Sequence, residues 1–188
     1  MNVFDFDNTI YHGESGVHMF LFFLRKHPEL LRFTFRVIQG VTLYKLHFID
    51  IDSALERYER VLNECFATIG DFNEAAVEFW DAHEKGIRPW YKTVQQEDDL
   101  IISAGPTASL REICKRLGVK RFLGTIINEE THELEFICFR QNKVAAFHEN
   151  YPGETIETFY TDSYNDKPLM DIAQHVFFVK GNRLRQIK

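Results

Sequence analysis

Two aspartates stand one residue apart at the end of the first apolar run of the chain, VFDFDNTI (residues 3–10). Asp5 and Asp7 repel each other when both are ionised, and burial of an unpaired carboxylate is energetically costly. The pair is therefore compatible with a strand end only where that end meets water or where a cation lies beside it. Carboxylates beside a cation can hold a divalent metal ion and transfer protons.

Further polar residues follow the later apolar runs. Ser103 ends the run DLIIS, and Asp162 ends TFYTD with Asp166 just beyond it, while Lys143 begins the predicted helix before TFYTD. Because ligands of open α/β sheets bind at the carboxyl ends of the strands, we expect these groups to converge on one edge. Several carboxylates with one lysine and one serine form a poor structural cluster. They form a good phosphoryl-transfer site once Mg²⁺ is added, since Mg²⁺ prefers hard oxygen ligands.

The elements that must position these groups change in character along the chain. Residues 1–10 have the pattern of a short buried strand, and apolar residues recur at helical spacing from about Gly16 to Glu84. Later segments predict strands at 99–103, 124–128, 158–162 and 176–179, part of a hairpin at 133–139, and helices at 106–118, 143–150 and 168–175. This alternation predicts an α/β fold, a Rossmann-like three-layer core with a mostly parallel sheet.

The long helical block indicates a second unit inserted into this core. We expect residues 1–13 and 89–188 to form the α/β catalytic core, and residues 14–88 to form a helical cap inserted after the first strand. The Phe-rich stripe from Phe20 to Phe48 is most simply the core of this cap. Basic residues interleave with these rings, which leaves open an apolar substrate pocket or a weak contact of the cap with a membrane surface or lipid.

Composition argues against several classes of function. The 188 residues carry a net charge of −6, so we expect no nucleic-acid partner. The cysteines, Cys65, Cys114 and Cys138, lack the spacing of a zinc site or a disulfide framework. The longest apolar stretch, residues 17–24, is far shorter than the roughly 20 residues that span a bilayer. We therefore expect no transmembrane segment and, without a secretory signal, a cytoplasmic protein.

The polar residues also occur in a known order. Asp5-Phe-Asp7-Asn-Thr9, Ser103, Lys143 and Asp162-Ser163-Tyr-Asn-Asp166 resemble the four motifs of the haloacid dehalogenase-like (HAD) phosphohydrolases. The resemblance runs from residue 3 to about 172, and residues 176–187 are similar to the closing segment of the phosphoserine-phosphatase-like branch. The helical insertion resembles the cap of that branch. Asn8 stands where the family often has Gly, but Asn tolerates the left-handed backbone that such a turn requires.

The resemblance implies a role for each residue of the first motif. Asp5 would be the nucleophile that attacks phosphorus and forms an aspartyl-phosphate. Asp7 would be the general acid for the leaving alcohol and then the base for the hydrolytic water. The dehalogenases of the family lack this second aspartate, so Asp7 favours a phosphatase. Thr9 would brace the turn that positions Asp7.

The later motifs would bind phosphate and metal. Ser103 would donate to a phosphate oxygen with the backbone N–H groups of the Ala104-Gly105 turn, and Lys143 would neutralise Asp5 and the phosphate. The resemblance implies Mg²⁺ as cofactor, held by Asp5, by the main-chain carbonyl of Asp7, and by Asp162 and Asp166. Ser163 would orient Asp166.

The substrate is left open by these motifs. The resemblance implies a small phosphorylated substrate, with phosphoserine first, and a phospholipid head group is the alternative. A different class of function is a catalytically silent scaffold whose Phe-rich helices bind a partner. Glu14 has two interpretations that remain equal, a contact to the substrate amine or an exposed glutamate at a helix start.

Overall fold

The computed structural model describes residues 1–45 and 51–188, and the described chain contains a seven-stranded sheet. Its strands are β1 (Asn2–Phe4), β2 (Leu100–Pro106), β3 (Arg121–Ile127), β4 (Leu134–Phe136), β5 (Thr158–Thr161), β6 (His175–Lys180) and β7 (Arg183–Gln186). They lie in the order β4-β3-β2-β1-β5-β6-β7. All pairs from β3 to β6 are parallel, and the edge strands β4 and β7 are antiparallel to their neighbours. The predicted mostly parallel sheet is confirmed.

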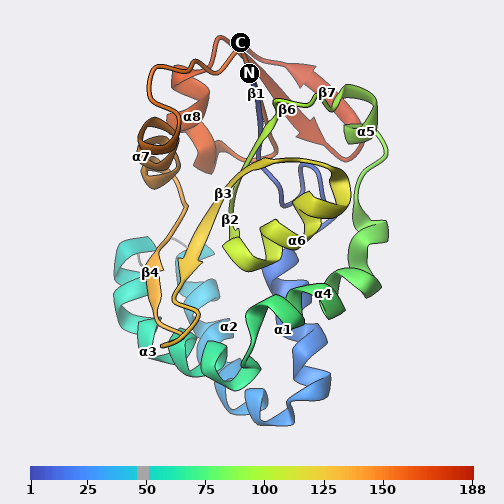
Figure 1. Ribbon diagram of the computed structural model, residues 1–188. Coiled ribbons are helices and arrows are strands. Elements are labelled where there is room, and N and C mark those ends of the chain that lie inside the picture. The colour runs from blue at the N-terminus through green and yellow to red at the C-terminus, as the bar shows by residue number, and fades with distance from the viewer. Residues whose placement is uncertain (46–50) are drawn as a thin grey trace.

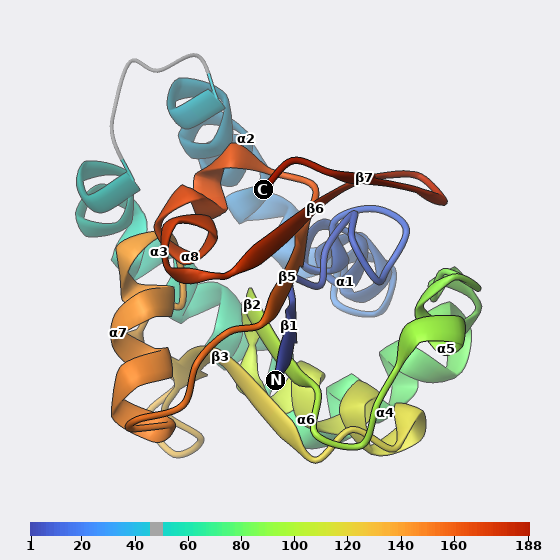
Figure 2. The ribbon, with the colours of Figure 1, turned by 90° about the horizontal axis from the view of Figure 1, so that it is seen from above.

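Helices cover both faces of this sheet, which gives the predicted three layers (Figure 2). Helix α6 (Thr107–Leu117) lies on one side, and α7 (Gln141–Asn150) and α8 (Lys167–Ile172) lie on the other. Successive side chains of a strand point to opposite faces. Val3 of β1 accordingly joins the apolar cluster beneath α7 and α8, whereas Phe4 joins the cluster that contains α6.

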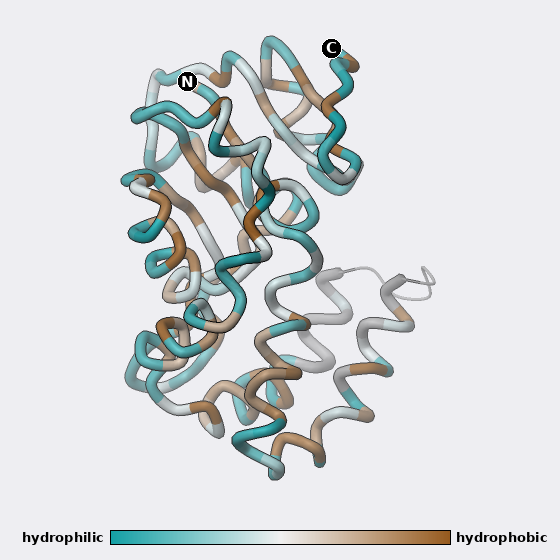
Figure 3. The backbone as a smooth tube through the Cα atoms, turned by 90° about the vertical axis from the view of Figure 1, so that its right-hand side faces the viewer, coloured by the Kyte–Doolittle hydropathy of each residue, from teal (hydrophilic) through white to brown (hydrophobic). Residues whose placement is uncertain are grey.

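The segment between β1 and β2 is mostly helical. It comprises α1 (Ser15–Lys26), η1 (Pro28–Leu30), α2 (Leu31–Lys45), α3 (Ile51–Ile69), α4 (Phe72–His83), η2 (Glu84–Gly86) and α5 (Tyr91–Val94). Helices α1 to α4 lie together at the end of the sheet toward which the parallel strands run (Figure 1). Apolar and polar stretches alternate along them (Figure 3), as in amphipathic helices. The Phe-rich stripe extends to Phe48, and residues 46–50 lie outside the described part.

Two chain crossings connect this helical block to the sheet, and they lie side by side. The N–H of His12 donates to the carbonyl of Gly86 (2.8 Å), and the N–H of Arg88 donates to the carbonyl of Ile10 (2.7 Å). Helix α4 also contacts α6, because the indole N–H of Trp80 donates to the carbonyl of Ser109 (2.9 Å). The predicted domain boundaries at residues 14 and 88 stay a prediction.

Some predicted elements need correction. Strand β1 ends at Phe4 rather than at residue 10, because the chain turns there and the N–H of Ile10 donates to the carbonyl of Phe6 (2.9 Å). The helix predicted over 168–175 ends at Ile172, since Ala173 is already extended and leads into β6. Strand β7 was not predicted, because its residues are exposed and carry no apolar alternation.

Other features of the described chain agree with the sequence. No helix in the described ranges is both long and apolar enough to cross a membrane. The three cysteines are buried free thiols. The segment predicted as part of a hairpin contains β4, which pairs antiparallel with β3.

Asp99 directly precedes β2, at the opposite end of the strand from the predicted site, and it offers a test of the core there. Its carboxylate is fully buried and accepts hydrogen bonds from the N–H of Gln96 (2.8 Å) and the amide of Asn2 (3.3 Å). Burial raises the pKa of Asp99 to about 6. The folded state therefore binds the proton of the Asp99 carboxyl group more tightly than the unfolded state does. The resulting contribution to the free energy of unfolding is fully present below about pH 4 and is lost as the pH rises through about 6.

We expect Asp99→Asn to remove this pH dependence. Relative to its effect at pH 4, the substitution should be more favourable by up to about 3 kcal/mol in the free energy of unfolding at pH 7.5, because the amide carries no charge at either pH. Urea unfolding at both pH values measures the difference. Asp98→Asn, at an exposed neighbouring position, is the matched control and is expected to shift stability by less than about 0.5 kcal/mol. A pH-independent difference between Asp99→Asn and wild type would contradict the assignment.

Candidate active site

The predicted polar residues lie in or just after three neighbouring strands, toward their carboxyl ends. Asp5 directly follows β1, Ser103 lies within β2, and Asp162 directly follows β5. Strand β1 stands between the other two and is parallel to both. After β1, the chain first forms β2 and β3 on one side of β1 within the sheet, and later forms β5 and β6 on the other side. Strand order therefore reverses at β1. Such a reversal opens a crevice at the carboxyl ends of the strands.

Lys143 joins two of these carboxylates. Its ammonium nitrogen lies 2.8 Å from Oδ1 of Asp5 and 2.7 Å from Oδ1 of Asp166. All three residues are buried, with 2 % of Lys143 exposed. Two other lysines that precede Lys143 in the core, Lys115 and Lys120, are exposed on or after α6 and contact none of these carboxylates. The structure therefore brings together Asp5, Lys143 and Asp166, which are far apart in the sequence.

Two threonines hold these carboxylates in place, and one corrects a prediction. The hydroxyl of Thr9 donates to Oδ2 of Asp5 (3.1 Å), so it supports Asp5 rather than the turn that positions Asp7. The hydroxyl of Thr161 donates to Oδ2 of Asp166 (2.8 Å). The side chain of Ser163, which was predicted to orient Asp166, accepts a hydrogen bond from the N–H of Asn165 (3.2 Å), and Ser163 contacts Asp166 through its carbonyl, which accepts the N–H of Asp166 (3.2 Å). Thr161 fills that role because it ends β5 with its side chain buried.

Asp7 is held by the start of α1. Its Oδ1 accepts the N–H of Ser15 (2.8 Å), an unsatisfied donor in the first turn of a helix. Asn8 has φ 58° in the turn after Asp7, which confirms that asparagine accommodates the left-handed backbone. Ser15 was not predicted as a residue of the site. The only available signal was the helix that begins eight residues after Asp7.

Glu14 lies at the exposed rim beside these groups. Its Oε1 accepts a hydrogen bond from the side-chain amide of Asn8 (3.3 Å), and its side chain does not cap α1. The negative charge of Glu14 contributes to the raised pKa values of Asp7 and Asp162, so it faces the same crevice. A substrate contact through Glu14 stays a prediction.

A hydrogen bond between Ser103 and Gly105 stabilises the turn after Ser103. Its hydroxyl oxygen accepts the N–H of Gly105 (3.0 Å), which leaves the hydroxyl hydrogen of Ser103 for another acceptor. A Cβ atom at Gly105 would lie 3.4 Å from this oxygen and 3.7 Å from the hydroxyl oxygen of Ser15. Two hydroxyl groups thus flank Gly105. Ala104, the other residue of the predicted phosphate turn, is exposed.

This arrangement matches a known family. A model of the haloacid dehalogenase-like hydrolases matches residues 3–171, from the start of β1 through Asp166 into α8. The chain belongs to the haloacid dehalogenase-like hydrolase family. The resemblance that the motifs indicated is therefore confirmed, as is the expectation of a hydrolase. No curated protein matches the chain.

Solved structures with the same fold have low sequence identity to this HAD hydrolase. A protein of unknown function from Bordetella pertussis Tohama I has a TM-score of 0.73 and 15% identity, and the match covers 94% of this chain and 87% of that chain. A phosphoserine phosphohydrolase-like protein from Francisella tularensis has a TM-score of 0.63 and 18% identity, with 94% and 86% covered. A phospho-aspartyl intermediate analogue of phosphoserine phosphatase has a TM-score of 0.52 and 13% identity, and the match covers 93% of this chain and 83% of that chain. These similarities show the fold.

The carboxylates of the HAD site have raised pKa values. Burial raises the pKa of Asp5 to about 7, against the opposing effect of Lys143 and with help from the charge of Asp166. Burial also raises the pKa of Asp7 to about 7, although the hydrogen bonds from Ser15 lower it. The pKa of Asp162 rises to about 6, through burial and the charge of Asp166. For Lys143, burial lowers the pKa, but the two carboxylates outweigh it and raise the pKa above its ordinary value.

The site also carries an excess of negative charge. Asp5, Asp7, Asp162 and Asp166 lie in one crevice with the single buried ammonium of Lys143. Within the described chain, no three His, Cys, Asp or Glu side chains already form a group that could hold a metal ion. A divalent cation that keeps several waters needs only one or two protein carboxylates together with substrate phosphate. These carboxylate oxygens are hard ligands with excess negative charge, so they fit a hard divalent cation.

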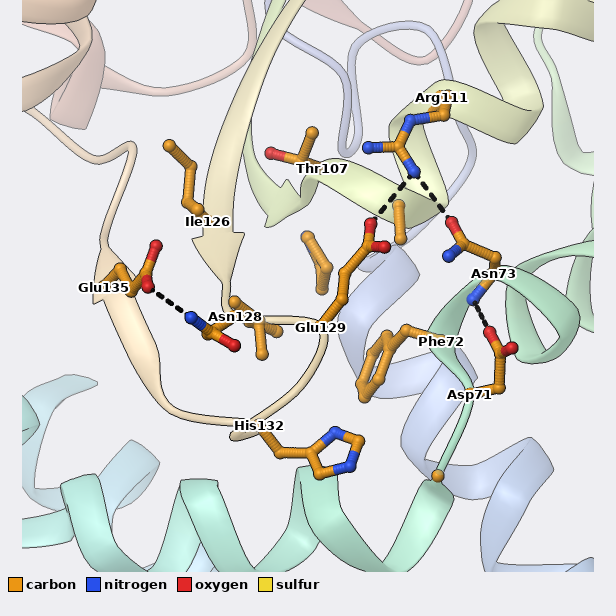
Figure 4. A pocket seen from close by; sticks show the side chains of 14 residues that line it. Asp71, Phe72, Asn73, Thr107, Arg111, Ile126, Asn128, Glu129, His132 and Glu135 are labelled. Carbon is orange, nitrogen blue, oxygen red and sulfur yellow. Dashed lines mark hydrogen bonds and ion pairs between the residues drawn. The ribbon is translucent and has the colours of Figure 1, made fainter.

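A cavity of about 570 Å³ lies beside the crevice on the β3 side (Figure 4). It is lined by the start of α4, the first turn of α6 and the loop between β3 and β4. Arg111 spans it, since its Nη1 donates to Oδ1 of Asn73 (2.7 Å) and to Oε1 of Glu129 (3.2 Å). None of the predicted catalytic residues lines this cavity, and the chain reaches its wall at Pro106, three residues after Ser103.

Proposed function

We propose that this HAD hydrolase is a Mg²⁺-dependent phosphomonoesterase that acts through an aspartyl-phosphate on Asp5. One observation carries the proposal: Asp5 is held by a buried lysine and a threonine, and Asp7, which has a pKa near 7, stands two residues away. A nucleophile and an acid–base group at this spacing serve the two halves of phosphate ester hydrolysis. The solved phospho-aspartyl analogue of phosphoserine phosphatase, which shares the fold, supports the same chemistry.

In the first step, a carboxylate oxygen of Asp5 attacks phosphorus, and the bond from phosphorus to the ester oxygen breaks. Asp7 gives its proton to that oxygen, so the alcohol leaves neutral. The hydroxyl of Ser103 donates to a phosphate oxygen, and Lys143 offsets the negative charge that gathers on the transferring group. The pKa of Asp7 suits this role, because a group near pH 7 is protonated in part of the molecules and releases its proton readily.

In the second step, Asp7 takes a proton from water as the water oxygen attacks phosphorus. The bond from phosphorus to Asp5 breaks, inorganic phosphate leaves, and both aspartates return to their starting states. Lys143 and Thr9 keep Asp5 in place throughout, because both hydrogen bonds go to its carboxylate oxygens. The helical block beside the strand ends would exclude bulk water and select the alcohol.

The proposed metal ligands are Asp5, the main-chain carbonyl of Asp7, Asp162 and Asp166. When bound, Mg²⁺ supplies positive charge that screens the carboxylates from the phosphate. Asp166 keeps free lone pairs for this role, since a carboxylate accepts about four hydrogen bonds or ligands and Asp166 uses one on Lys143 and one on Thr161.

The substrate that we propose is a small phosphorylated metabolite in the cytoplasm, with phosphoserine first. The Francisella tularensis neighbour and the position of Glu14 at the rim support this choice, because a carboxylate can pair with a substrate amine. A phospholipid head group is the second candidate. It is favoured by α2, where Phe35 is 75% exposed beside basic side chains.

Release of phosphate from p-nitrophenyl phosphate tests the proposal. We expect Mg²⁺-dependent turnover that EDTA abolishes, and a panel of phosphorylated metabolites and lipid head groups then ranks the substrates. Wild-type turnover no higher than that of Asp5→Asn would instead favour the catalytically silent scaffold.

Asp162→Asn tests the metal assignment. Because the amide removes one anionic ligand, we expect the Mg²⁺ concentration for half-maximal activity to rise by about 10- to 100-fold. Titration of Mg²⁺ against phosphate release measures it. Asp171→Asn is the matched control, since Asp171 is exposed and pairs with Lys167. Equal Mg²⁺ requirements in wild type and Asp162→Asn would contradict the assignment.

A further inference from the structure

Helix α2 exposes an apolar stripe on the side away from the fold. Leu31 is 64% exposed, Phe35 75% and Ile38 58%. They are spaced by four and three residues, so they lie on one face of the helix. Phe33, on the opposite face, is 4% exposed and packs in the core. The helix therefore has a buried apolar face and a second apolar face that no described part of the chain covers.

Basic side chains border this stripe. Arg32 and Arg36 are exposed one turn apart on α2, on the flank between the stripe and the buried face, where the guanidinium of Arg32 lies 4.4 Å from the ring centre of Phe33. The sequence of α2 contains two arginines and a lysine, and neither Asp nor Glu. The whole chain has a net charge of −6. The positive charge is thus concentrated beside the exposed apolar side chains.

We propose that α2 is a docking helix for the surface of an anionic phospholipid bilayer. Leu31, Phe35 and Ile38 would enter the boundary between head groups and acyl chains, and Arg32 and Arg36 would pair with lipid phosphates. A helix with apolar side chains on one face and cations beside them binds anionic membranes in this orientation. The docking surface is separate from the catalytic residues and does not depend on the proposed phosphatase activity.

A second copy of the chain fits this surface less well. In a two-fold symmetric dimer through the stripe, the same patch meets itself. The arginines of both copies would then lie at one interface, where α2 itself has no acidic residue and the nearby Glu29 of η1 already lies close to Arg32 of its own chain. Anionic lipid offers the opposite charge to the same side chains, so charge complementarity selects the bilayer.

Vesicle co-sedimentation tests the proposal with the full chain. We expect wild type to bind vesicles of equal parts phosphatidylglycerol and phosphatidylcholine, and to bind pure phosphatidylcholine vesicles at least tenfold more weakly. Replacement of Leu31, Phe35 and Ile38 together by Ser should lower the partition coefficient at least tenfold. Arg32→Gln with Arg36→Gln should lower it on anionic vesicles by about fivefold for each arginine. Raising the ionic strength to about 1 M should reduce it in wild type, since the Debye length falls to about 3 Å.

The control replaces three other exposed apolar residues, Val77, Ile172 and Leu184, by Ser, and should bind as wild type does. Asp5→Asn should also bind as wild type does, so a failed phosphatase proposal leaves this result untouched. Circular dichroism and gel filtration verify that each variant is folded. Failure of wild type to sediment with anionic vesicles would overturn the proposal. So would equal binding by the α2 serine variant, or a dimer that this variant converts to a monomer without any vesicle binding.

Discussion

Asp5→Asn should lower phosphate release from p-nitrophenyl phosphate by about 10³-fold or more while the protein stays folded. The amide cannot attack phosphorus, so the covalent half of the reaction is lost. The fold is retained because the replacement is isosteric. The carbonyl oxygen of the amide can accept from Lys143, and its N–H₂ can donate to Thr9, the two residues that contact Asp5 in wild type. Steady-state turnover at saturating Mg²⁺ measures the loss.

Two further measurements make this test decisive. Thermal unfolding of Asp5→Asn should stay close to that of wild type, which separates lost chemistry from lost structure. Asp171→Asn, at an exposed position on α8, should retain wild-type turnover. Retention of more than about a tenth of wild-type activity by Asp5→Asn would exclude Asp5 as the nucleophile.

Lys143→Met should have the largest effect on stability. Methionine fills a similar volume without the charge, so the carboxylates of Asp5 and Asp166 are left buried together without a cation. Removing one partner of a buried ion pair costs about 3–5 kcal/mol. Urea unfolding in EDTA measures the loss, because EDTA removes metal ions that would replace the missing charge. Lys115→Met, at an exposed position on α6, should cost less than about 0.5 kcal/mol.

A double-mutant cycle shows whether the cost comes from the ion pair. Asp166→Asn removes one of the two carboxylates that Lys143 contacts at 2.7 and 2.8 Å. In the background of Lys143→Met, Asp166→Asn should therefore restore part of the lost stability, with a coupling free energy of about 1.5 kcal/mol or more. Strictly additive effects would show that the Lys143–Asp166 pair does not contribute to the cost.

The residues that the structure brings together at the candidate site could be predicted because each stands at a recognisable boundary. Asp5 and Asp162 end apolar runs, and Ser103 precedes a Gly-Pro turn into a helix. Since the carboxyl ends of parallel strands share one edge, local patterns were enough to bring these residues together. Lys143 was favoured over Lys115 and Lys120 because those two lie on or just after a predicted helix, where charged side chains normally face water.

The supporting hydrogen bonds could not be predicted, because they depend on where side chains turn once strands are paired. Thr161 rather than Ser163 holds Asp166, and the main-chain N–H of Ser15 holds Asp7. Strand β7 has exposed residues throughout, so only its pairing with β6 reveals it.

Sequence alone determined the class of fold and the family and indicated the candidate carboxylates, because apolar runs and their polar ends are local features. The tertiary structure decided which apolar side chains face outward. Phe33 and Phe35 are equivalent in the sequence pattern of α2, yet one is buried in the core and the other is exposed. A helix with apolar residues on two faces can bury either one. The packing of neighbouring elements selects the face of α2 that contacts the core, and the other apolar face stays exposed.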